Sequence, residues 1–104
     1  MLLNSNLNTY ELLLETKATN PTEYTVKDIN SFRAISVMSY YTNGILGNVL
    51  IPTTIFKDTR DKVVQSGYGT PYISFASYVS DTKISAYVGG QNASNATCKV
   101  YGIK

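Results

Sequence analysis

The feature that most constrains the fold is the dipeptide Asn43-Gly44, which joins two strand-like runs within residues 36–52. A type I′ turn requires a positive φ at both central residues, and asparagine and glycine adopt that conformation at the lowest cost. With these two residues as the loop, Met38 is predicted to pair with Val49 across an antiparallel hairpin. The alternative is that the dipeptide lies in a longer loop between strands of different sheets.

This predicted register divides the hairpin between two faces, because successive side chains of a strand point to opposite sides. One face is predicted to point into the core, with the ring of Tyr40 over the bare backbone of Gly47, and it carries Met38, Tyr40, Ile45, Val49 and Ile51. The other face is mixed and only partly apolar, and it carries Val37, Ser39, Tyr41, Leu46, Asn48 and Leu50.

Alternating apolar and polar residues recur along the rest of the chain, with turn residues at intervals of about ten positions. The segments predicted as strands are 9–17, 23–27, 32–42, 45–51, 62–65, 72–80, 83–88 and 96–104. In the first of them Tyr10, Leu12 and Leu14 are predicted to share one face, although a helical reading exists there. Seven or eight short strands without a convincing helix predict an all-β, antiparallel two-sheet sandwich, jelly-roll-like, that forms a single domain over residues 1–104.

Composition agrees with that fold class. Charged residues make up 15% of the chain, below the usual share of about 25%, so Thr, Ser, Asn and Tyr must fill the solvent-facing strand positions. The net charge of +2 comes from residues spread along the chain, and without a run of Lys or Arg we expect no nucleic-acid partner. No apolar stretch approaches the length of a membrane span, and the start lacks the pattern of a signal peptide.

Residues that carry chemistry are sparse. The chain has no histidine, which excludes Ser-His-Asp and Cys-His relays and imidazole metal ligands. A two-carboxylate glycosidase remains formally open, but most of the seven acidic residues fall in turns or beside Lys or Thr. Calcium at Asp58 and Asp61 would need several loop carbonyls as further ligands, and a charged turn explains both residues. The single cysteine, Cys98, is predicted to be a small buried hydrophobe. We therefore expect no enzyme activity, no cofactor and no metal.

Nine tyrosines without a tryptophan are the most informative part of the composition. Tyr41 lies beside Asn43 and Tyr68 lies between two glycines, so both are expected at turns. A rigid ring with a hydroxyl, placed beside amide side chains, suits contact with sugars or protein surfaces. The candidate binding residues are Tyr41, Asn43, Tyr68 and Asn92, and a purely structural role is the alternative for each tyrosine.

Three short features carry a resemblance to a known group of proteins. The chain has an Ile-Pro step within residues 51–56, ends on Val100-Tyr101-Gly102-Ile103-Lys104, and has an early strand at residues 10–14. In these features it resembles the C-terminal β-sandwich head modules of bacteriophage tail fibres and related virion proteins. The resemblance implies a distal head domain, commonly a trimer, that caps a fibre or binds a host-surface glycan or protein. It also implies a location in the virion, and in the host cytoplasm before assembly.

Three functional hypotheses follow. The first is a non-enzymatic, oligomeric virion module with a subunit contact on the partly apolar hairpin face, formed by Val37, Tyr41, Leu46 and Leu50. The second is a monomeric carbohydrate-binding module that uses Tyr41 and Tyr68. The third is a small inhibitor or immunity protein that acts on a partner enzyme.

Overall fold

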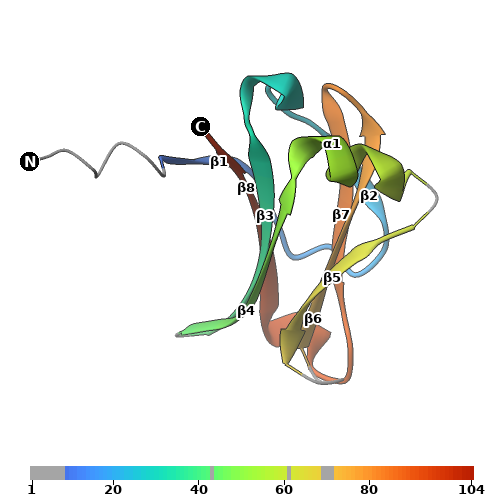
Figure 1. Cartoon of the computed structure of the whole chain (residues 1–104). Coiled ribbons are helices and arrows are strands. Elements are labelled where there is room, and N and C mark those ends of the chain that lie inside the picture. The colour runs from blue at the N-terminus through green and yellow to red at the C-terminus, as the bar shows by residue number, and fades with distance from the viewer. Residues whose placement is uncertain (1–8, 43, 61, 69–71) are drawn as a thin grey trace, which may run out of the picture.

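Two four-stranded sheets pack face to face in the computed structural model, which describes residues 9–42, 44–60, 62–68 and 72–104 (Figure 1). Within these residues the strands are β1 (Tyr10–Thr16), β2 (Thr22–Thr25), β3 (Ala34–Tyr41), β4 (Gly44–Pro52), β5 (Val64–Tyr68), β6 (Tyr72–Ser80), β7 (Lys83–Gly89) and β8 (Ala96–Ile103). The helical elements are short: α1 (Thr53–Phe56) and the 3-10 turns η2 (Ile29–Ser31), η3 (Lys57–Thr59) and η4 (Ala93–Asn95). The predicted all-β sandwich is confirmed.

Strand order shows how the chain closes on itself. The first sheet has the order β1-β8-β3-β4 and the second the order β2-β7-β6-β5. The paired strands are antiparallel. The first strand pairs with the last and the second strand with the last but one, as in a jelly roll. The nesting stops there, because β3 pairs with β4 and β5 with β6 as local hairpins.

The predicted register of the central hairpin is wrong by one position. Tyr41 pairs with Gly44 at the turn, where Thr42 has a φ of +31°, and Asn43 lies outside the described residues. Tyr40 then pairs with Ile45, and a bulge after that second pair leaves Leu46 without a direct partner. Beyond the bulge Val37 pairs with Val49. A shift of one residue exchanges the faces of one strand relative to the other, so Met38, predicted to pair with Val49, instead pairs with Asn48.

The shift in register also changes which residues of β3 belong to the core. Ile35 and Val37 are fully buried between the sheets, whereas Met38 and Tyr40 lie half-buried on the outside of the first sheet. Gly47 lies opposite Ser39 rather than beneath Tyr40. The prediction that Met38 and Tyr40 point into the core is therefore wrong.

A second bulge, in β1, overturns another predicted face. The pairing of β1 with β8 shifts between Leu12 and Leu14, so Leu12 lies opposite Tyr101 and Leu14 opposite Val100. Leu14 is buried, but Leu12 is 48% exposed. Because the extra residue at a bulge changes the direction of the side chains that follow it, Leu12 and Leu14 do not share a face.

The second sheet follows the predicted pattern more closely. Ile84, Ala86 and Val88 of β7 are fully buried as expected, and a tight turn at Asp81-Thr82 leads from β6 into β7. Cys98 on β8 is fully buried, as predicted. Residues 53–56, which lie outside the predicted strands, form α1, which covers one end of the sandwich (Figure 1).

The two sheets meet backbone to backbone along their β4 and β5 edges. A Cβ placed on Gly47 would lie 2.7 Å from the backbone nitrogen of Gly67. Glycine at both positions therefore permits a closer approach of the two strands than any side chain would allow.

Two serine hydroxyls inside the sandwich have no hydrogen-bond partner among the described residues. The oxygens of Ser39 and Ser66 are buried without one, whereas the equally buried Ser36 donates to the side chain of Asn48. A buried hydroxyl without a partner loses its hydration and gains nothing in return. These serines lower the stability of the fold.

We expect the Ser39→Ala variant to be more stable than the original chain by about 1 kcal/mol, because alanine removes the unsatisfied hydroxyl. Ser36→Ala serves as the matched control and is expected to lose a similar amount, because its hydrogen bond disappears. The midpoints of urea denaturation measure both changes. A loss of stability in both variants would contradict the assignment of Ser39.

Candidate functional site

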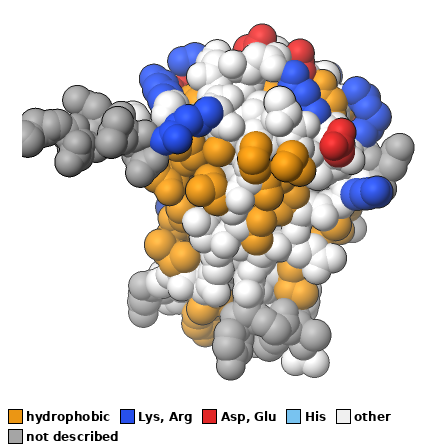
Figure 2. Space-filling view, viewed as in Figure 1, with side chains coloured by type: hydrophobic (Ala, Val, Ile, Leu, Met, Phe, Trp, Pro, Cys, Tyr) orange, Lys and Arg blue, Asp and Glu red, His pale blue; other side chains and the backbone are white. Residues whose placement is uncertain are grey.

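Charged residues are confined to part of the molecule. None occurs in residues 34–56, 63–80 or 84–98, which supply the β3–β4 hairpin, the β5–β6 hairpin and the loop between β7 and β8. In both hairpins the described strand ends next to the turn lie at the end of the sandwich opposite α1, as does the loop between β7 and β8 (Figure 1). On the side seen in Figure 2, the charged side chains likewise gather in the half that holds α1. The end opposite α1 is called the neutral end below.

Two of the four predicted binding residues meet at the neutral end. The rings of Tyr41 and Tyr72 pack at a centroid distance of 4.4 Å and an angle of 43°. The side-chain nitrogen of Asn92 donates to the hydroxyl of Tyr72 over 3.2 Å. A hydrogen bond with Tyr41, together with partial burial, raises the pKa of Tyr72. The phenol therefore stays neutral in the physiological range.

Of the other two predicted binding residues, the structure describes only the backbone of Tyr68. Tyr68 pairs through its backbone with Tyr72, but its side chain lies outside the described part of the structure, as does Asn43. Tyr72, which begins the predicted strand 72–80 and was not among the candidate binding residues, joins Tyr41 to Asn92. Sequence reasoning missed it because this contact joins strands of different sheets.

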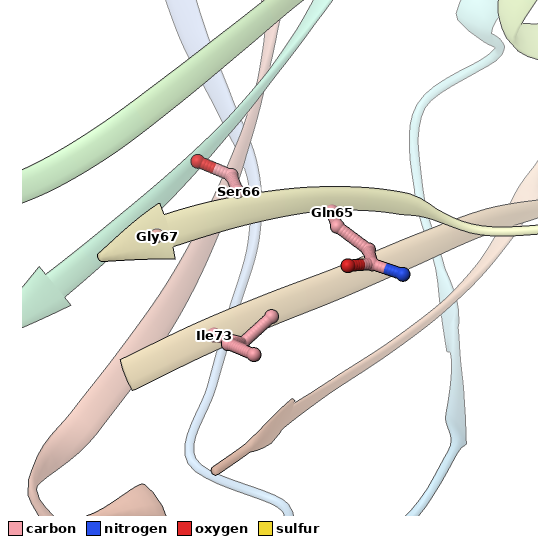
Figure 3. A pocket seen from close by; sticks show the side chains of 4 residues that line it. All are labelled: Gln65, Ser66, Gly67 and Ile73. Carbon is pink, nitrogen blue, oxygen red and sulfur yellow. The ribbon is translucent and has the colours of Figure 1, made fainter. Parts of the chain in front are cut away.

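A cavity of about 180 Å³ opens beside this cluster, over β5 and β6. Its lining consists of Gln65, Ser66, Gly67 and Ile73. Figure 3 shows the side chains of Gln65 and Ile73 between the two strands, whereas the hydroxyl of Ser66 points to the other side of β5. The amide of Gln65 is therefore the polar side-chain group that the cavity presents.

A pair of stacked rings adjoins the cavity on the outside of the second sheet. Phe75 pairs with Gln65 on one side and with Tyr87 on the other. The rings of Phe75 and Tyr87 lie 4.6 Å apart at an angle of 15°. A Cβ on Gly89 would lie 2.8 Å from the edge of the Phe75 ring. The missing side chain of Gly89 thus makes room for that ring.

A different surface, the outside of the first sheet, exposes apolar side chains. Leu12, Tyr101, Ser36 and Leu50 form one row across β1, β8, β3 and β4. The exposed fraction is 48% for Leu12 and 53% for Leu50. Ile45, opposite Tyr40, and Tyr10, packed against Tyr101, extend the exposed apolar surface along the sheet. This surface is called the outer face below.

Tyr40 contacts three neighbouring side chains in the middle of the outer face. Its hydroxyl lies 3.3 Å from that of Tyr101 and 3.4 Å from the sulfur of Met38. The Lys99 ammonium lies 4.4 Å from the centre of the Tyr40 ring, a favourable cation–π contact. The hydrogen bond with Tyr40 and partial burial raise the pKa of Tyr101 to about 12. The outer face therefore combines aromatic groups in mutual contact with exposed apolar side chains.

The predicted oligomer contact does not form one surface. Val37 is fully buried, and Tyr41 packs against Tyr72 between the sheets. Leu46 is the half-buried extra residue of the β4 bulge, and Leu50 alone of the four lies on the outer face. The grouping is wrong because it rested on the shifted register. Leu12 and Ile45, which sequence reasoning did not select, lie on the outer face with Leu50.

Besides the tyrosines, the described residues with a clearly shifted pKa are Cys98, Glu11 and Asp81. Burial raises the pKa of the Cys98 thiol to about 11, so the thiol stays protonated and unreactive at neutral pH. Glu11 lies 3.1 Å from the Lys104 ammonium, and Asp81 lies 3.5 Å from that of Lys57. A hydrogen bond from Lys104 lowers the pKa of Glu11, and one from Tyr78 lowers that of Asp81. Both carboxylates are therefore ionised and unsuited to act as general acids.

Comparison with known proteins yields no relative. No protein-family model matches the chain, and neither a curated protein nor a solved structure matches it. Across the described residues, no group of three or more Cys, Asp or Glu side chains could hold a metal ion. None of the described helices is long and apolar enough to cross a membrane. The functional argument therefore rests on the geometry of this chain.

Proposed function

We propose that the chain is a non-catalytic, phage-type virion module: a tail-fibre head or structural domain that assembles with copies of itself and contacts a host-surface glycan or protein. The resemblance described above supports this function, and a β-sandwich is the fold it implies. The lack of histidine and the pairing of carboxylates with lysines favour binding over catalysis.

The exposed apolar row on the outer face is the observation that carries the proposal. Leu12 and Leu50 are each about half exposed at opposite edges of a four-stranded sheet, with Tyr101 between them. Ser36, which is fully buried, lies between Tyr101 and Leu50 in this row, so the exposed apolar side chains stand toward its two edges. Exposed apolar side chains gathered on one face of a sheet are a feature of contact surfaces in soluble proteins. Covering it removes the apolar side chains from water, which is the main driving force of association.

A second copy of the chain is the partner that fits this surface. Glu15 and Lys99 pair across β1 and β8 on the same face, 3.9 Å apart. Because the patch carries both signs of charge, two copies can meet through it without net repulsion between like charges. The resemblance favours a trimer among the possible assemblies.

Light scattering coupled to size exclusion tests the assembly. We expect a multiple of the 11.4 kDa chain mass at tens of micromolar. The double variant Leu12→Asp, Leu50→Asp should weaken association by at least about tenfold, because burying each leucine is worth about 1.5–3 kcal/mol and a buried aspartate opposes contact.

Ile55→Asp is the matched control, because Ile55 is 54% exposed but lies on α1, away from the outer face. It should leave the mass unchanged. A strict monomer at tens of micromolar would contradict self-assembly. An equal loss of mass in the Ile55 variant would show that the outer face is not the contact.

A further inference from the structure

We infer that the outside of the second sheet at the neutral end binds an uncharged saccharide, seated in the cavity between Gln65 and Ile73 and against the Phe75–Tyr87 ring pair. This inference rests on the proposed function and deepens it, because it names the class of glycan and the residues that receive it. None of these four residues belongs to the outer face, so the two surfaces are separate.

The cavity has the size and chemistry of a small subsite. At about 180 Å³ it is smaller than the roughly 300–1,000 Å³ pockets that enclose drug-sized ligands, and it suits a single sugar ring. Ile73 gives it an apolar wall, and Gly67 leaves the backbone of β5 uncovered there. The Gln65 amide can both donate and accept a hydrogen bond, as paired sugar hydroxyls require.

The ring pair provides an apolar platform next to that subsite. Phe75 pairs with Gln65 and Tyr87 pairs with Phe75, so the three residues form one row across β5, β6 and β7. The Phe75 ring lies over Gly89 of β7. Both rings are half-buried and keep part of their surface in solvent. The C–H groups of a sugar pack against such rings, while its hydroxyls reach the amide and the Tyr87 hydroxyl.

The absence of charge selects the class of sugar. The four residues of the subsite lie within residues 63–80 and 84–98, which contain no Lys, Arg, Asp or Glu. The charged residues on neighbouring positions of the sheet are Lys83, which begins β7, and Glu23, which pairs with Ser85. Recognition of a carboxylate, sulfate or phosphate group relies on charge-assisted bonds from Arg or Lys. A neutral sugar needs no such group, because its hydroxyls can form hydrogen bonds with the amide and phenol groups of uncharged side chains. The site therefore favours neutral saccharides over acidic ones.

Saturation-transfer NMR with the full chain tests the inference. The probes are neutral trisaccharides built from glucose, mannose, galactose, xylose or N-acetylglucosamine, with sialyllactose and trigalacturonic acid as acidic counterparts. We expect binding of at least one neutral probe. Gln65→Ala should weaken it about 3- to 10-fold, the value of one hydrogen bond. Gly89→Ala should also weaken it, because the added Cβ displaces the Phe75 ring.

Gln91→Ala is the matched control: it removes the same exposed amide from the loop after β7 and should leave binding unchanged. Silence from every neutral probe in a chain that still assembles through the outer face would overturn the inference and leave the proposed assembly standing. Equal binding of the acidic probes would overturn the choice of uncharged sugars. Binding unaffected by both Gln65→Ala and Gly89→Ala would overturn the location.

Discussion

Replacing Gly67 by alanine is expected to lower the free energy of unfolding by about 3 kcal/mol. Gly67 has a φ of +150°, a conformation that alanine adopts only with strain. A Cβ at this position would lie 2.0 Å from the carbonyl oxygen of Tyr72. Both groups belong to backbone, so neither can move without disturbing the β5–β6 pairing. Urea denaturation followed by circular dichroism measures the loss.

Gly44→Ala is the matched control for this prediction. Gly44 also belongs to a hairpin strand at the neutral end, but a Cβ there would meet nothing within 4 Å. The free energy of unfolding of the Gly44→Ala variant should therefore differ from that of the original chain by no more than about 0.5 kcal/mol. Equal stability of the Gly67 and Gly44 variants would contradict the close packing described between β5 and β6.

Truncating Phe56 to alanine is expected to cost about 3–5 kcal/mol, the usual range for a fully buried phenylalanine. Phe56 is the largest fully buried side chain among the described residues, and it packs edge to face against Tyr78. It lies on α1, which closes the charged end of the sandwich. Its removal leaves a cavity that the short helix cannot refill. The denaturation midpoint again measures the change.

The neighbouring residue provides an internal control for Phe56. Ile55 lies on the same turn of α1 but is 54% exposed, so Ile55→Ala should alter stability by at most about 0.5 kcal/mol. A similar loss of stability in both variants would contradict the view that the burial of Phe56 is the main contribution of α1 to the stability of the fold.

Fold class could be predicted because it depends on local patterns. In β7 the alternation of Ile84, Ala86 and Val88 with polar residues is enough to assign both the strand and its buried face. The turn at Asp81-Thr82 lies next to it in sequence. Such signals require no knowledge of which strands become neighbours.

Register could not be predicted, because it depends on bulges. One extra residue at Leu46 and another between Leu12 and Leu14 decide which side chains point outward. Neither position has an unusual composition. The bulges are favoured by the burial of apolar side chains across the whole sheet. In the observed register Ile35 and Val37 lie in the core, in the place that the predicted register gave to Met38 and Tyr40.

The candidate sites were partly predictable. Tyr41 and Asn92 were selected for their chemistry and do come together, through Tyr72. Gln65 and Phe75 were not selected, because their proximity follows from the β5–β6 register. One available signal was overlooked: the long runs without charge mark the strands whose turns form the neutral end.

The pairing of the first strand with the last has a consequence for how the module is displayed. Lys104 donates its backbone N–H to the carbonyl of Thr9 over 3.0 Å, so β1 starts where β8 stops, at the charged end. A tether joined to either position would attach at that end of the sandwich, with the neutral end and the proposed sugar subsite on the side away from the support. Immobilising the protein on a bead or sensor chip through either position should therefore present the same surface to a ligand.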